Sequence, residues 1–473
     1  MIFLPVIEIQ RGGDKAAVKE SVVKHPFISF VVIAYNESAC IERCLDSLKA
    51  QTSPDFEAIV VDDASTDSSA DIIEASISGD RRFKLIKKSQ NGGAHLARKT
   101  GVSRATGEYV IFVDGDDEIS PELVKILKAV SSSRPDIDIW RFGINVKAEG
   151  DANQQQAYAT ERMFNDAFGE EHGTTILMNT FSDTLQNKEV WSVCVCMIKH
   201  ELCVRAFMMM TDSRLGYMED SYEFFILVSE ATSLYNITDV RGLQYHIGAG
   251  RSGRSPIAYP AYTRWVTEVY EMVNELNCYV THKSGRGVLS QCLEWLKLQY
   301  LAILGNEWVI RLNSADQTLA IDFMRDCIGD SDTLRLLLPP LVARCNWILQ
   351  QEDYIPQEGE EYYRWAKEFQ KIDRALPSQE LSEQRENARK VVAEVASRVK
   401  SNKLKEQSKR EQERLQEKEA EQRRREAENK RYFSPPSSRF RRIEKRLAPD
   451  GTFRGNLRVV FAERLHGNTD WQP

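Results

Sequence analysis

The sequence predicts an open α/β fold with a parallel sheet over the N-terminal part of the chain, on two observations. Apolar runs of strand length alternate with helical patterns from Phe27 to about Trp140, as in successive βαβ units. The apolar run Val110–Val113 then leads directly into three carboxylates, Asp114, Asp116 and Asp117. A buried parallel strand has this pattern, with its polar end at the edge of the sheet where ligands bind.

The strands and helices of this part follow one another in a regular order. The expected strands are residues 28–33, 58–62, 83–86 and 110–114. The expected helices begin near Glu37, Ser65, Gly93 and Ser120. The first helix carries an apolar face made of Ile41, Cys44, Leu45 and Leu48. The last begins with Ser120-Pro121, which supplies an N-cap and a first-turn proline.

The later segments differ in composition and predict further parts. Residues 143–190 are polar and weakly patterned, which indicates a variable connection with some helix. Beyond it, Trp, Tyr and Leu recur at helical spacing, and a run rich in Glu, Lys, Arg and Gln follows. The predicted division is a lead-in at 1–26, the α/β domain at 27–256, a helical subdomain at 257–376, a charged helix at 377–431 and a basic tail at 432–473.

Composition limits the class of protein. The formal net charge of −7 gives no overall case for nucleic-acid binding. Nine scattered cysteines fit a reduced, cytoplasmic protein better than a disulfide framework. No apolar run is long enough for a transmembrane helix, and the apolar residues Met1–Ile7 lack the marks of a signal peptide. We therefore expect any work at a membrane to be done from its surface.

Four motifs occur in order at the expected strand ends. They are Ala34-Tyr-Asn-Glu37, Val61-Asp-Asp-Ala-Ser-Thr-Asp67, Asn91-Gly-Gly-Ala-His-Leu-Ala-Arg98 and Val110-Ile-Phe-Val-Asp-Gly-Asp-Asp117. Together they resemble the family 2 glycosyltransferases of the GT-A fold, over about residues 27–255. The family usually has proline before the Tyr-Asn pair, where this chain has Ala34. That position contacts the donor through its backbone, so we expect the change to matter little.

The first motifs predict a nucleotide pocket. A carboxylate at Asp62 or Asp63 can accept the uracil N3–H, and the resemblance implies that Tyr35 and Glu37 flank the nucleoside. Asn91 and Arg98 belong to the same predicted pocket, with Arg98 reaching the nucleotide or its phosphates. The alternatives without a binding role are that the Ser-Thr-Asp segment is a helix N-cap and that Arg98 lies on a solvated helix face.

The carboxylates after the strand predict a metal site for Mn²⁺ or Mg²⁺, since hard cations prefer oxygen ligands. Asp116 is expected to bind the metal directly, and Asp114 to contact the ribose or the metal through water. Two roles stay open for Asp117: a contact within the site, or the shaping of the turn alone. A cation there would neutralise the diphosphate of a departing sugar nucleotide. In isolation, the same residues would also fit an acidic turn.

A second acidic segment predicts the catalytic base. Gly216-Tyr-Met-Glu-Asp-Ser-Tyr-Glu-Phe-Phe225 resembles the Glu-Asp-x-x-Phe segment of the family. The resemblance implies that Asp220 deprotonates the acceptor hydroxyl and that Glu219 supports the site, with inversion at the anomeric carbon. The alternative is an amphipathic helix with Asp220 as an early-turn carboxylate.

The segment Tyr245–Ser255 resembles the small-residue loop that follows the base in the family. It implies His246 as a third metal ligand and Arg251 or Arg254 as a clamp on the diphosphate. A structural histidine is the alternative. Clustered Cys194, Cys196 and Cys203 fit core packing better than a metal site.

The predicted function is the inverting, metal-dependent transfer of a sugar from a nucleotide donor to a surface glycan or glycolipid. We expect the donor to be UDP-linked. A non-catalytic module that binds nucleotide-sugar and scaffolds through its charged helix is the second hypothesis. A nucleotidyltransferase is the third, although it should carry a Gly-rich basic loop where Ala34-Tyr-Asn-Glu37 stands. The basic stretch Arg423–Arg446 would suit peripheral contact with the inner face of the plasma membrane or a solvated tail. The short seam Ala388–Val399 would allow a homo-oligomer.

Overall fold

The computed structural model describes residues 25–150, 153–184, 190–248, 255–283, 286–352 and 354–433. Within them the chain divides into two compact units. The first contains the described residues up to Ala343 together with Glu361–Glu386. The second contains Arg344–Glu360 and the described residues from Asn387 onward.

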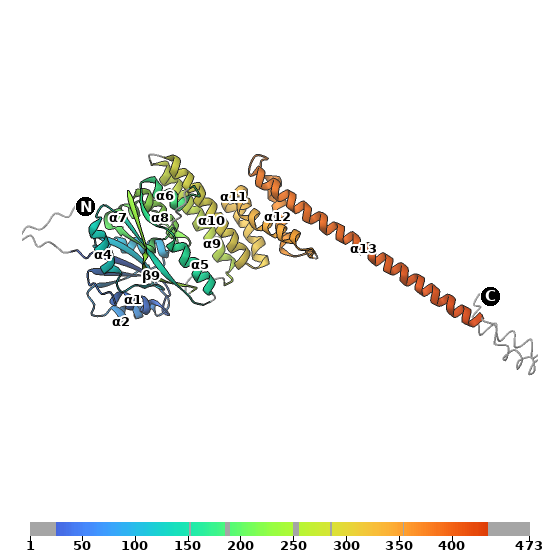
Figure 1. The fold of residues 1–473 in the computed structure, drawn as a ribbon, viewed down its shortest axis with the longest axis horizontal. Coiled ribbons are helices and arrows are strands. Elements are labelled where there is room, and N and C mark those ends of the chain that lie inside the picture. Colours follow the sequence, from blue (N-terminus) through green and yellow to red (C-terminus); the bar gives the residue numbers. More distant parts are fainter. Residues whose placement is uncertain are drawn as a thin grey trace, which may run out of the picture. The chain divides into compact units, whose positions relative to one another are not determined.

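The first unit is built on a sheet of nine strands within these ranges (Figure 1). They are β1 Ile28–Ala34, β2 Phe56–Asp62, β3 Phe83–Lys87, β4 Tyr109–Asp114, β5 Glu118–Ile119, β6 Ile139–Ala148, β7 Gly169–His172, β8 Cys196–Lys199 and β9 Ser233–Ile247. Their order is β3-β2-β1-β4-β8-β6-β9-β5, and β7 pairs with β9. Because β1 to β4 are mutually parallel, their carboxyl ends meet at one edge. The predicted α/β fold is confirmed.

The strands of this parallel part are apolar because helices cover both faces. All seven residues of β2 are buried, and β4 is buried from Tyr109 to Val113 before Asp114 emerges half-exposed. The predicted apolar face of the first helix is likewise buried at Ile41, Cys44, Leu45 and Leu48. This packing places the polar strand ends at the sheet edge as a group.

The helices of the first unit begin with four that alternate with strands. They are α1 Ile41–Lys49, α2 Ser69–Ile77, α3 Gly93–Val102 and α4 Leu123–Ser133. The next are α5 Gln154–Asn165, α6 Thr174–Phe181, a 3₁₀ turn Val193–Val195, α7 His200–Met209 and α8 Glu219–Glu230. The last are α9 Tyr259–Thr281, α10 Arg286–Arg311 and α12 Glu361–Ala375, while α11 Ser314–Gln350 and α13 Ser382–Phe433 continue into the second unit.

Two helices after residue 257, α9 and α10, pack directly on helices of the α/β part. Helix α10 lies against α6 and α9, and α9 also contacts α8 (Figure 1). The described residues on both sides of the predicted boundary at 256 therefore belong to one compact unit. The boundary itself stays a prediction. No helix among the described residues is long and apolar enough to cross a membrane.

The segment expected as a polar connection begins with a long strand instead. Strand β6 runs to Ala148 and lies between β8 and β9, with Phe142, Ile144 and Val146 buried. Asn145 and Lys147 are exposed between these apolar residues, and this alternation is itself a strand pattern that the prediction missed. The expected helix in this segment is present as α5 and α6.

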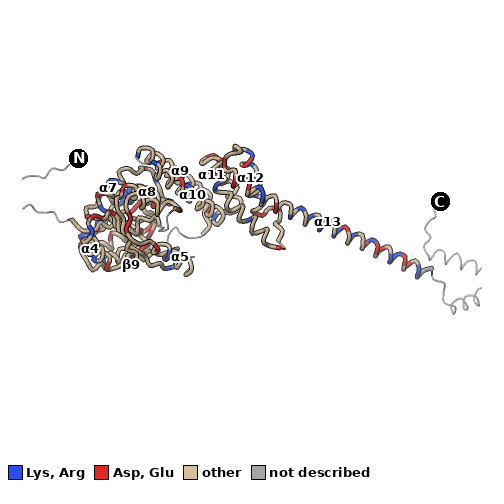
Figure 2. Tube along the Cα trace, turned by 45° about the horizontal axis from the view of Figure 1, so that its top comes forward, with Lys and Arg blue, Asp and Glu red and all other residues tan. Residues whose placement is uncertain are grey.

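The second unit contains most of α13, a helix whose charged residues of both signs alternate along its length (Figure 2). Pairs four residues apart join Arg410 to Glu406 and Arg425 to Glu421 at 3.9 and 3.0 Å. The apolar residues of the predicted seam, by contrast, are no more than 9% exposed. The seam is therefore covered within the single chain and offers no open surface to a second copy. The basic tail lies outside the described residues.

Gly101→Ala should destabilise the protein. Helix α3 lies so close to β1 that a Cβ at Gly101 would stand 2.2 Å from Cγ1 of Val31. We expect a loss of ~2 kcal/mol in the free energy of unfolding, measured by urea denaturation. Gly287→Ala is the matched helical control, because its Cβ would meet nothing within 4 Å. Equal stability of the two variants would contradict the close packing of α3 on β1.

Candidate active site

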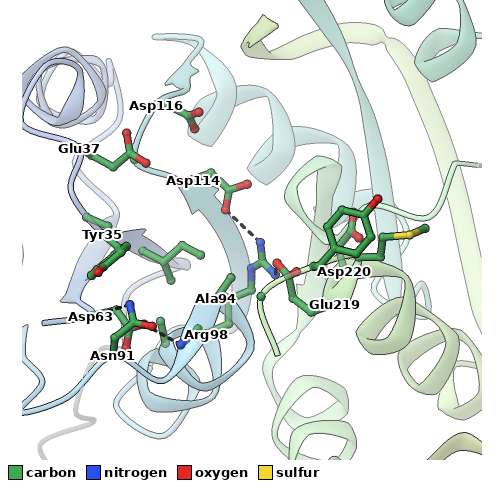
Figure 3. A pocket seen from close by; sticks show the side chains of 18 of the residues that line it. Tyr35, Glu37, Asp63, Asn91, Ala94, Arg98, Asp114, Asp116, Glu219 and Asp220 are labelled. Atoms are coloured by element: carbon green, nitrogen blue, oxygen red, sulfur yellow. Dashed lines mark hydrogen bonds and ion pairs between the residues drawn. The ribbon is translucent and has the colours of Figure 1, made fainter. Parts of the chain in front are cut away.

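A cavity of ≈ 430 Å³ opens at the carboxyl ends of β1, β2 and β4. Figure 3 shows Tyr35, Asp63 and Asn91 on one side, Glu219 and Asp220 on the other, and Asp114 with Arg98 between them. The predicted residues that line it are Ala34, Tyr35, Glu37, Asp63, Asn91, Arg98, Asp114, Asp116, Glu219 and Asp220. Segments from across nearly two hundred residues of sequence thus meet in one place.

The loops after β1 and β2 are joined by polar contacts. Asn36 has a left-handed backbone with φ of 58°, and its side-chain oxygen accepts a hydrogen bond from the Thr66 amide at 2.8 Å. The Ser65 hydroxyl accepts one from the Asn36 amide at 3.0 Å. A left-handed conformation at a non-glycine residue costs free energy, so its presence here indicates a functional constraint on this loop.

Asp63 holds the loop that begins α3. Its carboxylate accepts hydrogen bonds from the amides of Gly92 and Gly93, at 3.0 and 2.8 Å, and forms an ion pair with Lys88. A carboxylate can accept further donors, so a contact with uracil stays a prediction. Of the two predicted alternatives, Asp63 lines the cavity, whereas Asp62 does not.

The carboxylates after β4 occupy different environments. Burial and the charges of Asp114 and Glu37 raise the pKa of Asp116 to about 7. The side chain of Asp114 is 38% exposed at the cavity. Asp117 is buried, and its carboxylate accepts a hydrogen bond from the His246 amide at 3.0 Å. Its observed contact is therefore structural.

The oxygen ligands of this cluster fit a hard divalent cation. Asp116 is held near like charges, and a cation would relieve that repulsion. No three His, Cys, Asp or Glu side chains in the described part of the chain already form a metal cage. The fit therefore rests on Asp116 and Asp114, with the remaining ligands left to the diphosphate of a donor and to water.

His246 does not join this cluster as predicted. Its side chain is fully buried, with Nδ1 at 2.8 Å from Glu149 and Nε2 at 2.7 Å from Glu118. Both ring nitrogens are engaged, so neither is open to a metal beside Asp116. The sequence around His246 does not indicate either of these two partners. Arg251 and Arg254 lie outside the described residues.

Arg98 also differs from its predicted role. Its guanidinium is buried and contacts Asp114 at 3.0 Å and both Glu219 and Glu223 at 3.1 Å. Three carboxylates neutralise it, so in this arrangement it organises the site instead of reaching out to phosphates. Glu223 in turn contacts Nδ1 of the buried His95 at 2.8 Å. Sequence reasoning missed Glu223 and His95, although both lie within the quoted motifs.

Asp220 is placed to take up a proton. It begins α8 next to Glu219, and burial and the Glu219 charge raise its pKa to about 8. A carboxylate with a pKa near the working pH is an effective general base. Its contact with the cavity agrees with the predicted role, which stays a prediction.

The helical part adds residues that the sequence did not indicate. Arg311 and Glu307 of α10 line the cavity together with Tyr217. Tyr217 stacks on Trp265 of α9 with ring centres 4.2 Å apart, and Arg311 lies over the same ring at 5.2 Å. Tyr217 belongs to the Gly216–Phe225 segment, whereas Trp265, Glu307 and Arg311 lie far from the motifs in sequence. Only the packing of α9 and α10 brings these three to the site.

Residues 29–192 match the sequence model of the family described as Glycosyl transferase family 2. The chain contains a family 2 glycosyltransferase domain. The predicted resemblance is thereby confirmed, while the metal dependence stays a prediction.

Relatives match over part of this chain. Glycosyltransferase GlyG of Streptococcus pneumoniae is 37% identical over 24% of this chain and 38% of its own length. The poly(ribitol-phosphate) beta-glucosyltransferase of Bacillus spizizenii is 40% identical over 25% of this chain and 19% of its own. The chain thus spans about two fifths or less of the length of these curated relatives.

A solved structure shares the fold more widely. S. aureus TarS 1-349 in complex with UDP-GlcNAc aligns with a TM-score of 0.50 and 20% identity, over 78% of this chain and 91% of that one. This likeness shows a shared fold, an α/β domain followed by helices.

Asp220→Asn should change how stability depends on pH. The pKa of Asp220 is raised from 3.8 to about 8, so the folded chain holds this proton more tightly than the unfolded chain. Stability from this group is therefore present at low pH and lost as pH rises between about 4 and about 8. We expect the variant to gain about 3–6 °C in Tm over the wild type at pH 8.5, and much less at pH 5.

Asp212→Asn is the matched control, because this carboxylate is 89% exposed. It should give no comparable gain at pH 8.5. Thermal unfolding of all three proteins at both pH values is the measurement. An Asp220→Asn gain that is the same at pH 5 and pH 8.5 would contradict the raised pKa.

Proposed function

We propose that this protein is an inverting glycosyltransferase. It moves a sugar from a nucleotide-diphosphate donor, UDP-linked, to a hydroxyl of a cell-surface polysaccharide or glycolipid. One observation carries the proposal: the carboxylates Asp114 and Asp116 share a cavity with a separate acidic residue, Asp220, whose pKa is about 8. UDP-GlcNAc in TarS and the glucosyltransferase named among the relatives support the donor class.

The donor side holds and orients the sugar nucleotide. Tyr35, Glu37 and Asn91 bind the nucleoside at the ends of β1 and β2, and Asp63 holds the glycine loop beside it. Asp116 and Asp114 would hold Mn²⁺ or Mg²⁺, which neutralises the charge on the leaving diphosphate. The reacting end of the donor thus lies at the carboxyl end of β4.

The acceptor side supplies the base. Asp220 takes the proton of the acceptor hydroxyl as its oxygen attacks the anomeric carbon from the face opposite the diphosphate. The bond from that carbon to the diphosphate oxygen breaks, the nucleotide diphosphate leaves, and the configuration inverts. Arg98 holds Glu219 in place beside Asp220, at 3.1 Å from Glu219, and partly opposes the burial that raises the pKa of Glu219. Burial and the charge of Glu219 in turn raise the pKa of Asp220.

We infer a cytoplasmic location, at the inner face of the plasma membrane when the acceptor is lipid-linked. All nine cysteines are unpaired, which suits a reducing compartment.

Asp220→Asn should abolish transfer. The amide cannot accept the proton, so we expect a loss of about 10²–10⁴-fold in kcat, measured with radiolabelled UDP-sugars. Asp212→Asn, an exposed carboxylate outside the cavity, should keep wild-type activity. A folded Asp220→Asn variant with full transfer would rule out this base, and complete inactivity of the wild type toward all donors would favour a binding module.

Removal of divalent cations should stop donor turnover. The Asp116 carboxylate, held beside Asp114 and Glu37, needs a counter-charge to bind a diphosphate. We expect EDTA to remove UDP-sugar hydrolysis and Mn²⁺ to restore it, with Asp116→Ala unresponsive to Mn²⁺. Thermal shift with UDP in the presence and absence of Mn²⁺ gives a second readout independent of turnover. Full activity in EDTA would contradict a metal at this cluster.

A further inference from the structure

A second cavity, of ≈ 820 Å³, shares one lining residue with the first. That residue is Asp220, and none of the other described residues that line the second cavity borders the first. The two are also connected through a ring pair, because Phe164 of the second cavity stacks on Tyr245 of the first at 6.4 Å. A ligand in the second cavity can therefore present a group to Asp220 while a donor occupies the first.

Aromatic rings fixed by their neighbours form part of the wall. Trp191 and Trp295 meet edge to face with ring centres 5.9 Å apart, and Phe181 stacks on Trp191 at 6.2 Å and 2°. The indole N–H of Trp295 donates a hydrogen bond to Asp183 at 2.8 Å. Rings held in this way lose little conformational entropy when a ligand binds against them.

Helix α5 lines the cavity with large exposed side chains. Tyr158 is 67% exposed and Met163 is 52% exposed, although both have large apolar surfaces. Exposed apolar groups gathered at a concave surface indicate a binding site more often than isolated ones do. Trp and Tyr in particular combine a flat apolar face with a polar edge, as the alternating faces and hydroxyls of a sugar ring require.

The polar groups of the cavity suit an uncharged ligand. Among the described residues, the charged ones that line it are Arg162, Asp166 and Asp220, and Arg162 lies 3.7 Å from Asp166. This described part of the lining thus carries one cation against two carboxylates. Its other polar side chains are neutral: Gln155, Tyr158, Asn179, Thr180 and Ser182, with the two indoles. Neutral groups can hydrogen-bond sugar hydroxyls, whereas a phosphate-rich chain would find too little positive charge there.

We propose that this cavity binds the acceptor, and that the acceptor end is a neutral sugar whose ring lies against Tyr158, Trp191 and Trp295. The inference rests on the proposed function, since it assigns the second substrate of the same reaction. The sugar hydroxyl that reaches Asp220 is the one that is glycosylated. A cavity of this volume is in the range, about 300–1,000 Å³, that holds a ligand of the size of a short oligosaccharide.

The test uses the full chain with p-nitrophenyl glycosides of glucose, galactose and N-acetylglucosamine as neutral acceptors. An oligomer of glycerol phosphate is the anionic alternative, and a decyl glycoside tests for a lipid contact. Transfer from UDP-sugars gives the KM of each acceptor, and saturation-transfer NMR reports binding without turnover. We expect binding and transfer with at least one neutral glycoside and none with the phosphate oligomer.

Tyr158→Ala should raise the acceptor KM by about fivefold, because one stacking face is lost. Tyr270→Ala is the matched control, since Tyr270 is 42% exposed on α9 and lines neither cavity. Trp295→Ala should abolish the NMR signal of the bound glycoside. If it fails to fold, Tyr158→Ala decides the question.

The outcomes separate the two proposals. A wild type that hydrolyses no UDP-sugar contradicts the proposed function, while the NMR result still decides whether the cavity binds a sugar. Donor hydrolysis with no glycoside binding, an unchanged KM in Tyr158→Ala, or preference for the phosphate oligomer each overturns the acceptor assignment. Binding that requires the decyl chain overturns it in favour of a lipid.

Discussion

The buried guanidinium of Arg98 is the interaction on which the site depends. It joins the end of β4 to the start of α8 through Asp114, Glu219 and Glu223, and the guanidinium itself is only 3% exposed. A buried ion cluster of this kind adds little stability over an apolar core, but the loss of one partner is costly. Arg98 therefore acts mainly by positioning. It holds Asp114, on the donor side, next to Glu219, which precedes the base Asp220.

Two other carboxylates near this cluster are poised for chemistry. Burial and neighbouring carboxylates raise the pKa of Asp116 to about 7 and that of Asp220 to about 8, and neither is among the three carboxylates that contact Arg98. The raised pKa of Asp116 suits the binding of a cation, and the raised pKa of Asp220 suits the uptake of a proton. A charge balance that is incomplete within the protein alone is typical of sites that are completed by ligands.

Much of this arrangement is readable from local patterns. Strand β4 is apolar because both of its faces are covered, and its end is acidic because it reaches the sheet edge, so Val110–Asp117 carries both facts in eight residues. The parallel order of β1, β2 and β4 then brings the neighbouring motifs to the same edge. Partners in three dimensions are less readable. Arg98 and His246 were expected at the ligand, but each contacts two carboxylates more than ninety residues away. These are Glu219 and Glu223 for Arg98, and Glu118 and Glu149 for His246.

The sequence by itself determined the α/β class and the strand ends that carry Asp114 and Asp116, because periodicity and strand-end polarity are local properties. Asp220 was singled out only by the resemblance of its segment to a family motif. Only the tertiary structure decided that Arg98 organises the site, that His246 is withdrawn from it and that α10 contributes Arg311 to its wall. It also decided that Asp220 stands between two cavities. These outcomes depend on how distant segments pack, because the pattern of one segment shows which of its faces is buried but not which distant segment covers that face.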